Sequence, residues 1–265
     1  MSTYLDVLRY RELLGNLFRR DLQAKYRGSA LGVLWTVANP IMLMGVYLLV
    51  FGVVWKSNFA IIDHYPLFLL TGLALWTFFA AAVLSSTRSM LDNANLIRKT
   101  RFPRQLVPLS VVFAHLVSFA VMLSLLLVVN FIALPRVRAT EWLAIPLALL
   151  FVGFVCGIAL ALASLNVLFR DIEFIVAALL VPLFFLTPIL YSLTGAQLEK
   201  HRYVVEVIHW LNPLSPALQA VRAPLFAGTL PRWSDALYLV VACAVARAVG
   251  ALVFRSVDDQ IAIEV

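Results

Sequence analysis

The residue types that usually carry chemistry are sparse in this chain, and their spacing excludes the commonest sites. None of the four histidines has metal-ligand spacing, because even His201 and His209, which could share a helix face, lack a third ligand. The sequence has no GxSxG nucleophile elbow, and it has no GxxxxGK loop that could hold nucleotide phosphates. We therefore predict no catalytic residue, no metal and no cofactor on this chain.

The acidic residues favour neither an enzyme nor a proton-driven carrier. The carboxylates predicted on the outer side, Asp63, Glu141, Glu199 and Glu206, form no close pair, so transfer of a lipid-linked sugar would lack an acid and a base. A proton-coupled carrier needs acidic residues in the middle of its membrane segments, and none lies there. His115 does lie inside an apolar run, where we expect a hydrogen bond to a neighbouring helix rather than a proton relay. Transport driven by a separate protein remains.

Aromatic side chains are the one class within the apolar runs that could contact a substrate. Flat rings stack on the apolar faces of sugars, so these residues are candidates for a glycan path. An interfacial belt of Trp and Tyr, common in membrane proteins, is the alternative. The candidates are Tyr47, Phe51, Trp76, Phe79, Phe184, Phe185 and Tyr191.

The elements that position these residues must be helices in lipid. Of 265 residues, 63% are hydrophobic and 13% are charged, whereas soluble domains are roughly 45 to 50% apolar and about 25% charged. Runs of about 20 apolar residues are long enough to cross a bilayer as helices. We predict an all-α integral membrane protein, with residues 1–265 forming a single permease-like domain. Its six spans are predicted at 33–54, 67–86, 109–131, 143–168, 173–191 and 236–254.

Basic residues set the predicted orientation. They are concentrated in residues 1–32 and in the loop after the second run, and the positive-inside rule places both in the cytoplasm. Six spans then put the C-terminus in the cytoplasm as well. The net charge of +7 is therefore assigned to the membrane edge, and nucleic acid is not expected as a partner.

Residues 4–25 are predicted to form an amphipathic helix at the membrane interface. Leu14, Leu17 and Phe18 share one face, while Arg19 and Asn16 lie on the opposite face. The helix could be a plain lipid anchor or a docking surface for a partner protein.

Four local signals refine this picture. A short helix is predicted from Asp92 to Lys99, because Pro103 separates it from the next span. Residues 192–235 are predicted to form two short interfacial or re-entrant helices, the second capped by Ser215, although a simple surface lid is the alternative. Pro40, Pro182 and Pro188 should kink or break their helices. The GxxxG patterns in "GSALG" and "GFVCG" predict close helix packing.

Several stretches together resemble one family, the permease subunits of ABC transporters that export polysaccharides such as O-antigen, capsule and teichoic acid. They occur in order over nearly the whole chain. The matching stretches are "KYRGSALGVLWTVANP" (25–40), "LIRKTRFPRQLVPLS" (96–110), "NVLFRDIEFI" (166–175), "TPILYS" (187–192) and "LNPLSPALQAVRAPLF" (211–226).

The resemblance implies a homodimer in the cytoplasmic (inner) membrane, bound to two cytoplasmic ATPase subunits that carry the ATP and magnesium. It also implies a lipid-linked polysaccharide substrate, foremost O-antigen, and contact with membrane lipids. The segment 4–25 would be the interface helix, 92–102 the coupling helix, "LFRDIE" (168–173) a second contact, and 195–226 a re-entrant pair. The implied interface residues are Arg9, Arg19, Arg20, Lys25, Tyr26 and Arg27. The implied ATPase-coupling residues are Asp92, Asn95, Leu96, Arg98, Lys99, Arg101, Phe102, Arg170, Asp171 and Glu173.

Two other functions stay open at this point. One is a membrane subunit of envelope polymer assembly that needs no ATPase, and the other is a drug or small-lipid exporter of the same architecture. A GxxxxGK[ST] protein encoded in the neighbouring reading frame would favour export.

Overall fold

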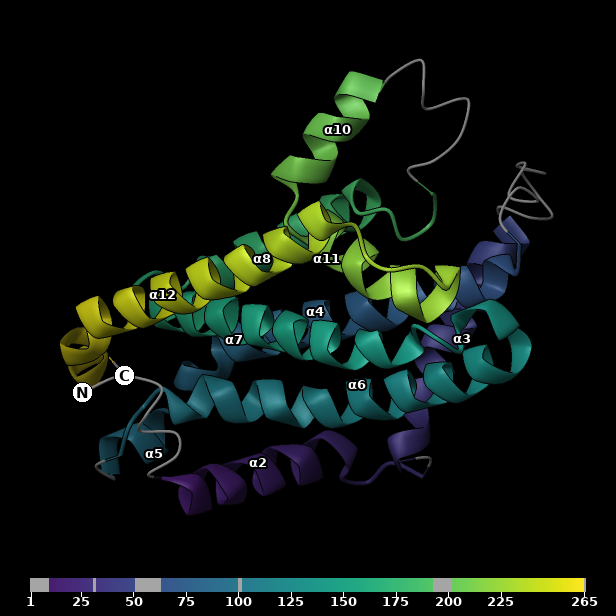
Figure 1. The fold of residues 1–265 in the computed structure, drawn as a ribbon. Coiled ribbons are helices and arrows are strands. Elements are labelled where there is room, and N and C mark those ends of the chain that lie inside the picture. The colour runs from purple at the N-terminus through teal and green to yellow at the C-terminus, as the bar shows by residue number, and fades with distance from the viewer. Residues whose placement is uncertain (1–9, 31, 51–62, 100–101, 193–201, 265) are drawn as a thin grey trace.

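The computed structural model of the chain describes residues 10–30, 32–50, 63–99, 102–192 and 202–264, and every regular element in these ranges is helical (Figure 1). In chain order the elements are α2 (Arg11–Tyr26), η1 (Gly32–Leu34), α3 (Trp35–Tyr47), α4 (Tyr65–Asp92), α5 (Ala94–Lys99), α6 (Leu106–Ala133), η4 (Pro135–Val137), η5 (Glu141–Leu143), α7 (Ala144–Leu168), α8 (Ile172–Leu186), α10 (Arg202–Leu211), α11 (Leu214–Arg222), η6 (Ala223–Ala227) and α12 (Trp233–Glu264).

Four of these helices are long and apolar enough to cross a membrane. They cover Tyr65–Asp92, Leu106–Ala133, Glu141–Leu168 and Trp233–Asp258. Two further apolar helices, Trp35–Val50 and Ile172–Leu186, are shorter. The chain is therefore all-α, with a minimum of four membrane-capable helices in the part that the structure describes.

The helix inside the fifth predicted span, 173–191, ends before the span does. α8 stops at Leu186, and Thr187 adopts an extended backbone (φ −89°, ψ 134°), because the residue before a proline avoids the helical region. Pro188 thus ends the helix, as predicted. Pro40 and Pro182, in contrast, remain inside α3 and α8.

Helices α7 and α12 approach each other most closely at glycines. A Cβ added to Gly157 would lie 2.4 Å from the carbonyl carbon of Ala246, and one added to Gly250 would lie 2.4 Å from the Gly157 oxygen. The packing predicted from "GFVCG" is confirmed. The packing predicted from "GSALG" is wrong, because Gly28 and Gly32 have positive φ (76° and 48°) and nothing within 4 Å of an added Cβ. These two glycines form a turn between α2 and α3.

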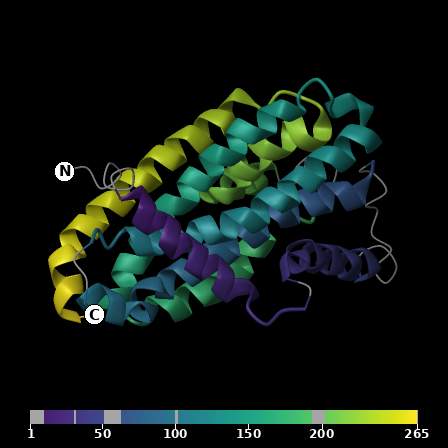
Figure 2. The same cartoon turned by 90° about the horizontal axis from the view of Figure 1, so that it is seen from below.

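Helix α2 lies across the bundle instead of along it. Figure 2 shows α2 crossing the direction of the long helices, as expected of an interface helix. Leu17 is buried and Leu14 and Phe18 are half-buried against the bundle, while Arg19 is exposed. The two predicted faces are therefore those of the observed helix. Arg9 lies outside the described residues.

The short helix after α4 is shorter than predicted. Asp92 is the last residue of α4, and α5 runs only from Ala94 to Lys99. The break falls at Asn93, whose Nδ2 donates to the Ser89 oxygen at 2.8 Å and so caps the end of α4. Figure 1 shows α5 and the C-terminal turns of α12 at one end of the bundle, which we call the α5 end.

The predicted second short helix between the last two spans also begins differently. α11 starts at Leu214, behind an Asn212 side chain whose oxygen accepts the Leu214 N–H at 3.1 Å. Ser215 is therefore inside the helix and does not cap it. We call Arg202–Leu211, Leu214–Arg222 and Ala223–Ala227 together the α10–η6 segment.

Candidate functional site

The α5 helix is anchored by one buried side chain and presents its polar residues outward. Ile97 is 7% exposed and packs in a cluster with Met90 of α4, Leu160 and Val167 of α7 and Phe254 of α12. The predicted contact residues of this helix are exposed or half-buried: Asn95, Leu96, Arg98 and Lys99. Ile97 therefore connects α5 to α4, α7 and α12, so a displacement of α5 would also displace these three long helices.

An ion pair joins the end of α4, next to α5, to the start of α8. Arg88 Nη1 lies 3.0 Å from Glu173 Oε1, and its Nε lies 3.8 Å from Asp92 Oδ1. The Glu173 backbone N–H donates to Asn166 Oδ1 at 3.0 Å, which fixes the first turn of α8 to the end of α7. Arg170 and Asp171 are exposed beside this turn. The two predicted contact segments thus meet on one surface, although Arg88 itself was not among the predicted residues.

A second ion pair joins the loop after α5 to the last helix. Arg104 Nη1 lies 3.0 Å from Asp258 Oδ1 and also donates to the Asp258 carbonyl oxygen. Phe102 is half-buried and packs on the Ile97 cluster. Arg101 lies outside the described residues. The loop is therefore fixed at both ends, by Ile97 before it and by Arg104 after it.

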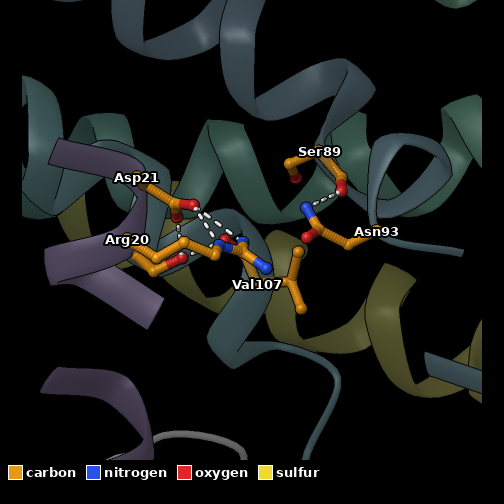
Figure 3. A network of polar contacts seen from close by, with 6 residues as sticks. Arg20, Asp21, Ser89, Asn93 and Val107 are labelled. Carbon is orange, nitrogen blue, oxygen red and sulfur yellow. Dashed lines mark hydrogen bonds and ion pairs between the residues drawn. The ribbon is translucent and has the colours of Figure 1, made fainter. Parts of the chain in front are cut away.

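The interface helix is joined to the start of α6 by Asp21. Its Oδ2 accepts the Ser110 hydroxyl at 2.7 Å, and its Oδ1 accepts Arg20 Nη2 at 2.7 Å. Figure 3 shows Arg20 and Asp21 facing Val107 of α6, with Asn93 turned back to Ser89. Arg19, Arg20 and Arg27 are exposed, and Arg20 is paired with Asp21 beside α6.

Lys25 points inward, at the C-terminal end of α2. Its Nζ donates to Ser118 Oγ at 2.6 Å and lies 3.2 Å from His115 Nδ1. The Tyr26 hydroxyl lies 2.8 Å from the same Ser118 Oγ, and His115 Nε2 lies 3.2 Å from Ser85 Oγ. His115 is hydrogen-bonded to neighbouring helices, as predicted. Burial lowers the pKa of Lys25 to about 8, although the residue keeps exposed surface at the mouth of a cavity.

Six of the seven predicted aromatic residues form one connected cluster. The Phe184 ring lies 5.7 Å from that of Tyr47, 5.3 Å from that of Trp76 and 5.3 Å from that of Phe185. Trp76 in turn lies 5.9 Å from Phe79. Tyr191 donates its hydroxyl to the Phe185 oxygen at 3.2 Å. Phe51 lies outside the described residues.

Burial divides this aromatic cluster into two kinds of residue. Phe79 and Phe184 are 5% and 7% exposed, so within one chain they are core residues. Phe185 is 58% exposed, and the remaining three keep intermediate exposure. The cluster therefore offers only part of its predicted surface to a substrate.

The α10–η6 segment is fastened by polar contacts that sequence spacing did not reveal. His209 bridges Ser215 Oγ at 2.8 Å and Asp235 Oδ1 at 3.0 Å. Ser215 is only 1% exposed, so this Ser–His–Asp arrangement is closed to a substrate and holds α10, α11 and α12 together. Asn212 donates to Thr187 Oγ1 at 2.9 Å, at the end of α8.

Arg222 is a buried cation in the same segment. Its guanidinium donates to the Pro188 oxygen at 2.7 Å and more weakly to the Ile189 oxygen at 3.4 Å, and it lies 3.8 Å from the centre of the Phe68 ring. Burial lowers its pKa to about 9. Nothing in the sequence around Arg222 distinguishes it from the exposed basic residues.

Comparisons with known proteins agree with this architecture. A profile for the family described as "ABC-2 type transporter" matches residues 12–226. The O-antigen export system permease protein RfbA of Myxococcus xanthus is 34% identical over 97% of this chain and 96% of its own length. A protein of the same name from Klebsiella pneumoniae is 34% identical over 83% of this chain and 82% of its own. The polysialic acid transport protein KpsM of Escherichia coli is 24% identical over 92% of each.

Proposed function

The chain belongs to the ABC-2 type transporter family, and on that premise we propose that it is the membrane-spanning permease subunit of a polysaccharide exporter. Its substrate would be a lipid-linked polysaccharide of the O-antigen class, moved across the cytoplasmic membrane by a separate ATPase. The observation that carries this proposal is the 34% identity to an O-antigen export permease over nearly the full length of both chains.

The proposed topology has six spans with both termini in the cytoplasm. α8, with 15 residues, would be about 22 Å long at about 1.5 Å per residue, which is short of a hydrocarbon core of about 30 Å. The turn residues after Thr187 would complete this span, packed against Arg222 and not exposed to lipid. The α5 end would face the cytoplasm, because Arg88, Arg98, Lys99 and Arg104 gather there. The α10–η6 segment would then be the outer re-entrant pair.

The proposed partners are a second copy of the chain and two ATPase subunits. We place the ATPase contact on α5 and on the exposed pair Arg170 and Asp171, because both lie at the α5 end. The Arg88–Glu173 ion pair joins the end of α4, directly before α5, to the first turn of α8. Closure of the ATPase pair on ATP would push α5 and the end of α4, and the ion pair would carry that displacement to α8. The wall formed by α3 and α8 would then open to admit the glycan.

The glycan would contact those aromatic residues of the cluster that keep exposed surface, namely Tyr47, Trp76, Phe185 and Tyr191. Stacking of one sugar on a ring contributes on the order of 1 kcal/mol, so several rings can guide a polymer without trapping it. Phe185→Ala should lower the export rate several-fold. Phe174→Ala is the matched control, because Phe174 is 70% exposed on the same helix but near the α5 end.

Deletion of the chain in its host strain tests the proposed function. Surface polysaccharide should disappear while lipid-linked polymer accumulates on the cytoplasmic side, and replacement of the phosphate-loop lysine in the partner ATPase should give the same result. Unchanged surface polysaccharide in the deletion strain would refute the proposal. If surface polysaccharide is lost in the deletion strain but not in the strain with the altered ATPase, the chain is better explained as an assembly subunit that needs no ATPase.

A further inference from the structure

A cavity of about 370 Å³ lies where α2 meets α3, α4 and α6. This volume is within the range of small-ligand sites, about 300 to 1,000 Å³. Its wall is mostly apolar on the α4 side, with Ala74, Phe78 and Ala81 beside Thr77, and carries more polar groups elsewhere. The polar lining residues are Lys25, Tyr26, Thr36, Asn39, Thr77, His115 and Ser118. The cavity is distinct from the α5 surface and from the aromatic cluster.

The cation in this cavity has no anion. Within the part of the chain that the structure describes, no carboxylate lies within 4.0 Å of the Lys25 ammonium, and its polar partners are the neutral groups of Ser118 and His115. A lysine carries three N–H donors, so two partners leave one for a ligand. Removing a cation from water without a counter-charge is costly. The lowered pKa of Lys25 expresses the same cost.

The groups around Lys25 suit a phosphate ester. The hydroxyls of Tyr26 and Ser118 lie 2.8 Å apart, next to the ammonium, and one of them donates to the other. The ammonium and the second hydroxyl can therefore both donate to phosphate oxygens. Charge-assisted hydrogen bonds of this kind are about twice as strong as neutral ones.

The mouth of the cavity indicates that the phosphate belongs to a lipid. Trp35, at the start of α3, lines the cavity and is 46% exposed. The same helix continues with Ile41, Met42 and Val46, which are 42%, 52% and 57% exposed. An amphiphile with its headgroup at Lys25 could lay its hydrocarbon chain along this apolar surface and shield it from water.

We propose that this cavity binds the phosphate group of a lipid, with Lys25 and one hydroxyl of the Tyr26–Ser118 pair as the donors and the apolar surface of α3 beside the lipid chain. The inference goes beyond the proposed function, because it requires only that α2 lies at a membrane surface. The lipid could be a membrane phospholipid or the carrier of the glycan, and the experiment distinguishes these two.

Native mass spectrometry of the full permease, co-purified with its ATPase, can test the site. The probes are dioleoyl phosphatidylglycerol, polyprenyl phosphate without a glycan, and inorganic phosphate. Lys25→Gln should weaken lipid binding at least tenfold, because a hydrogen bond to a charged group contributes about 1.5 to 3 kcal/mol. Arg11→Gln is the matched control, because it removes a positive charge from an exposed side chain of the same helix that does not line the cavity, and it should bind lipid as the wild type does.

Each outcome decides the proposal. Tighter binding of polyprenyl phosphate than of phosphatidylglycerol assigns the site to the glycan carrier, and equal binding assigns it to membrane phospholipid. The proposal is overturned if Lys25→Gln binds as the wild type does, if Arg11→Gln loses as much affinity, or if inorganic phosphate binds as tightly as the lipids. Should Lys25→Gln not fold, Lys25→Arg and Ser118→Ala replace it. Ser118→Ala should lose several-fold in affinity, whereas Lys25→Arg should keep it, and the opposite pattern would refute the site.

Discussion

Replacement of Gly157 by alanine should separate α7 from α12. The added Cβ would lie 2.4 Å from the carbonyl carbon of Ala246, 2.5 Å from its oxygen and 2.6 Å from the Arg247 nitrogen, whereas ordinary contacts begin at 3.4 Å. All three atoms belong to the backbone, so no side chain can turn away to make room. The two helices must therefore move apart by about 1 Å at this point.

The cost of that movement can be estimated from packing. Overpacking of a close contact costs about 1 to 3 kcal/mol, and a gap of 0.5 to 1 Å forfeits about a quarter to a half of each dispersion contact along the seam. Alanine also gains about 1 kcal/mol of helix propensity over glycine, which opposes the loss. Gly15→Ala measures that gain alone, because nothing lies within 4 Å of its added Cβ. We expect Gly157→Ala to be less stable than Gly15→Ala by about 2 to 3 kcal/mol.

Thermal unfolding of the purified permease in detergent measures this difference. At about 2 to 4 °C per kcal/mol, Gly157→Ala should melt on the order of 5 °C below Gly15→Ala. Gly250→Ala disturbs the same contact from the other side, so the double variant should lose less than the sum of the two single losses. If Gly157→Ala melts at or above the temperature of Gly15→Ala, the close approach of the two helices is not the packing described above.

Three further predictions concern charged side chains. Arg222→Leu should cost about 2 to 5 kcal/mol of stability, because it leaves the Pro188 carbonyl without its donor, while the exposed Arg232→Leu should melt as the wild type does. Arg88→Glu should uncouple ATP hydrolysis from export, and Glu173→Arg in the same chain should restore much of the coupling; no rescue would exclude the ion pair as the link. Phosphatidylglycerol binding should weaken above pH 8 as Lys25, in contact with His115 and Tyr26, loses its proton, and Lys25→Arg should remove that pH dependence up to pH 10.

The pH dependence of stability follows from the direction in which the Lys25 pKa is shifted. Burial lowers the pKa of the folded lysine to about 8, below its ordinary 10.5. Between these two values the unfolded chain binds more protons than the folded chain, so stability without lipid should rise with pH in this window. A bound phosphate favours the charged lysine and should flatten that rise. A melting curve in lipid-free detergent and one with phosphatidylglycerol would show the difference.

Hydrophobic run length predicted the long helices well and the polar contacts between them poorly. The runs at 67–86 and 109–131 are each inside the observed helices α4 and α6, because lipid-buried backbone must form helical hydrogen bonds. The end of α8 was missed by five residues, since an apolar composition continues past the proline that stops the helix. Composition therefore predicts that a helix exists better than it predicts where the helix ends.

Contacts across the bundle carry no local sequence signal. Lys25 and Ser118 are 93 residues apart, and Arg104 and Asp258 are 154 apart. A positive charge near the first span predicts only an orientation, so Lys25 could not be distinguished from Arg27. Likewise, the two GxxxG patterns look alike in sequence, yet only the glycines of the second one, Gly153 and Gly157, meet another helix. The patterns restrict where pairs can form, and tertiary packing selects the pairs.

The guanidinium of Arg222 connects the α10–η6 segment to the residues that follow α8. It holds the two residues that follow the broken end of α8, and Asn212 holds Thr187 just before them. These contacts join the α10–η6 segment to the end of α8. In the proposed mechanism a tilt of α8 would therefore move the α10–η6 segment as well, so that the entry and the exit of the polymer would open together.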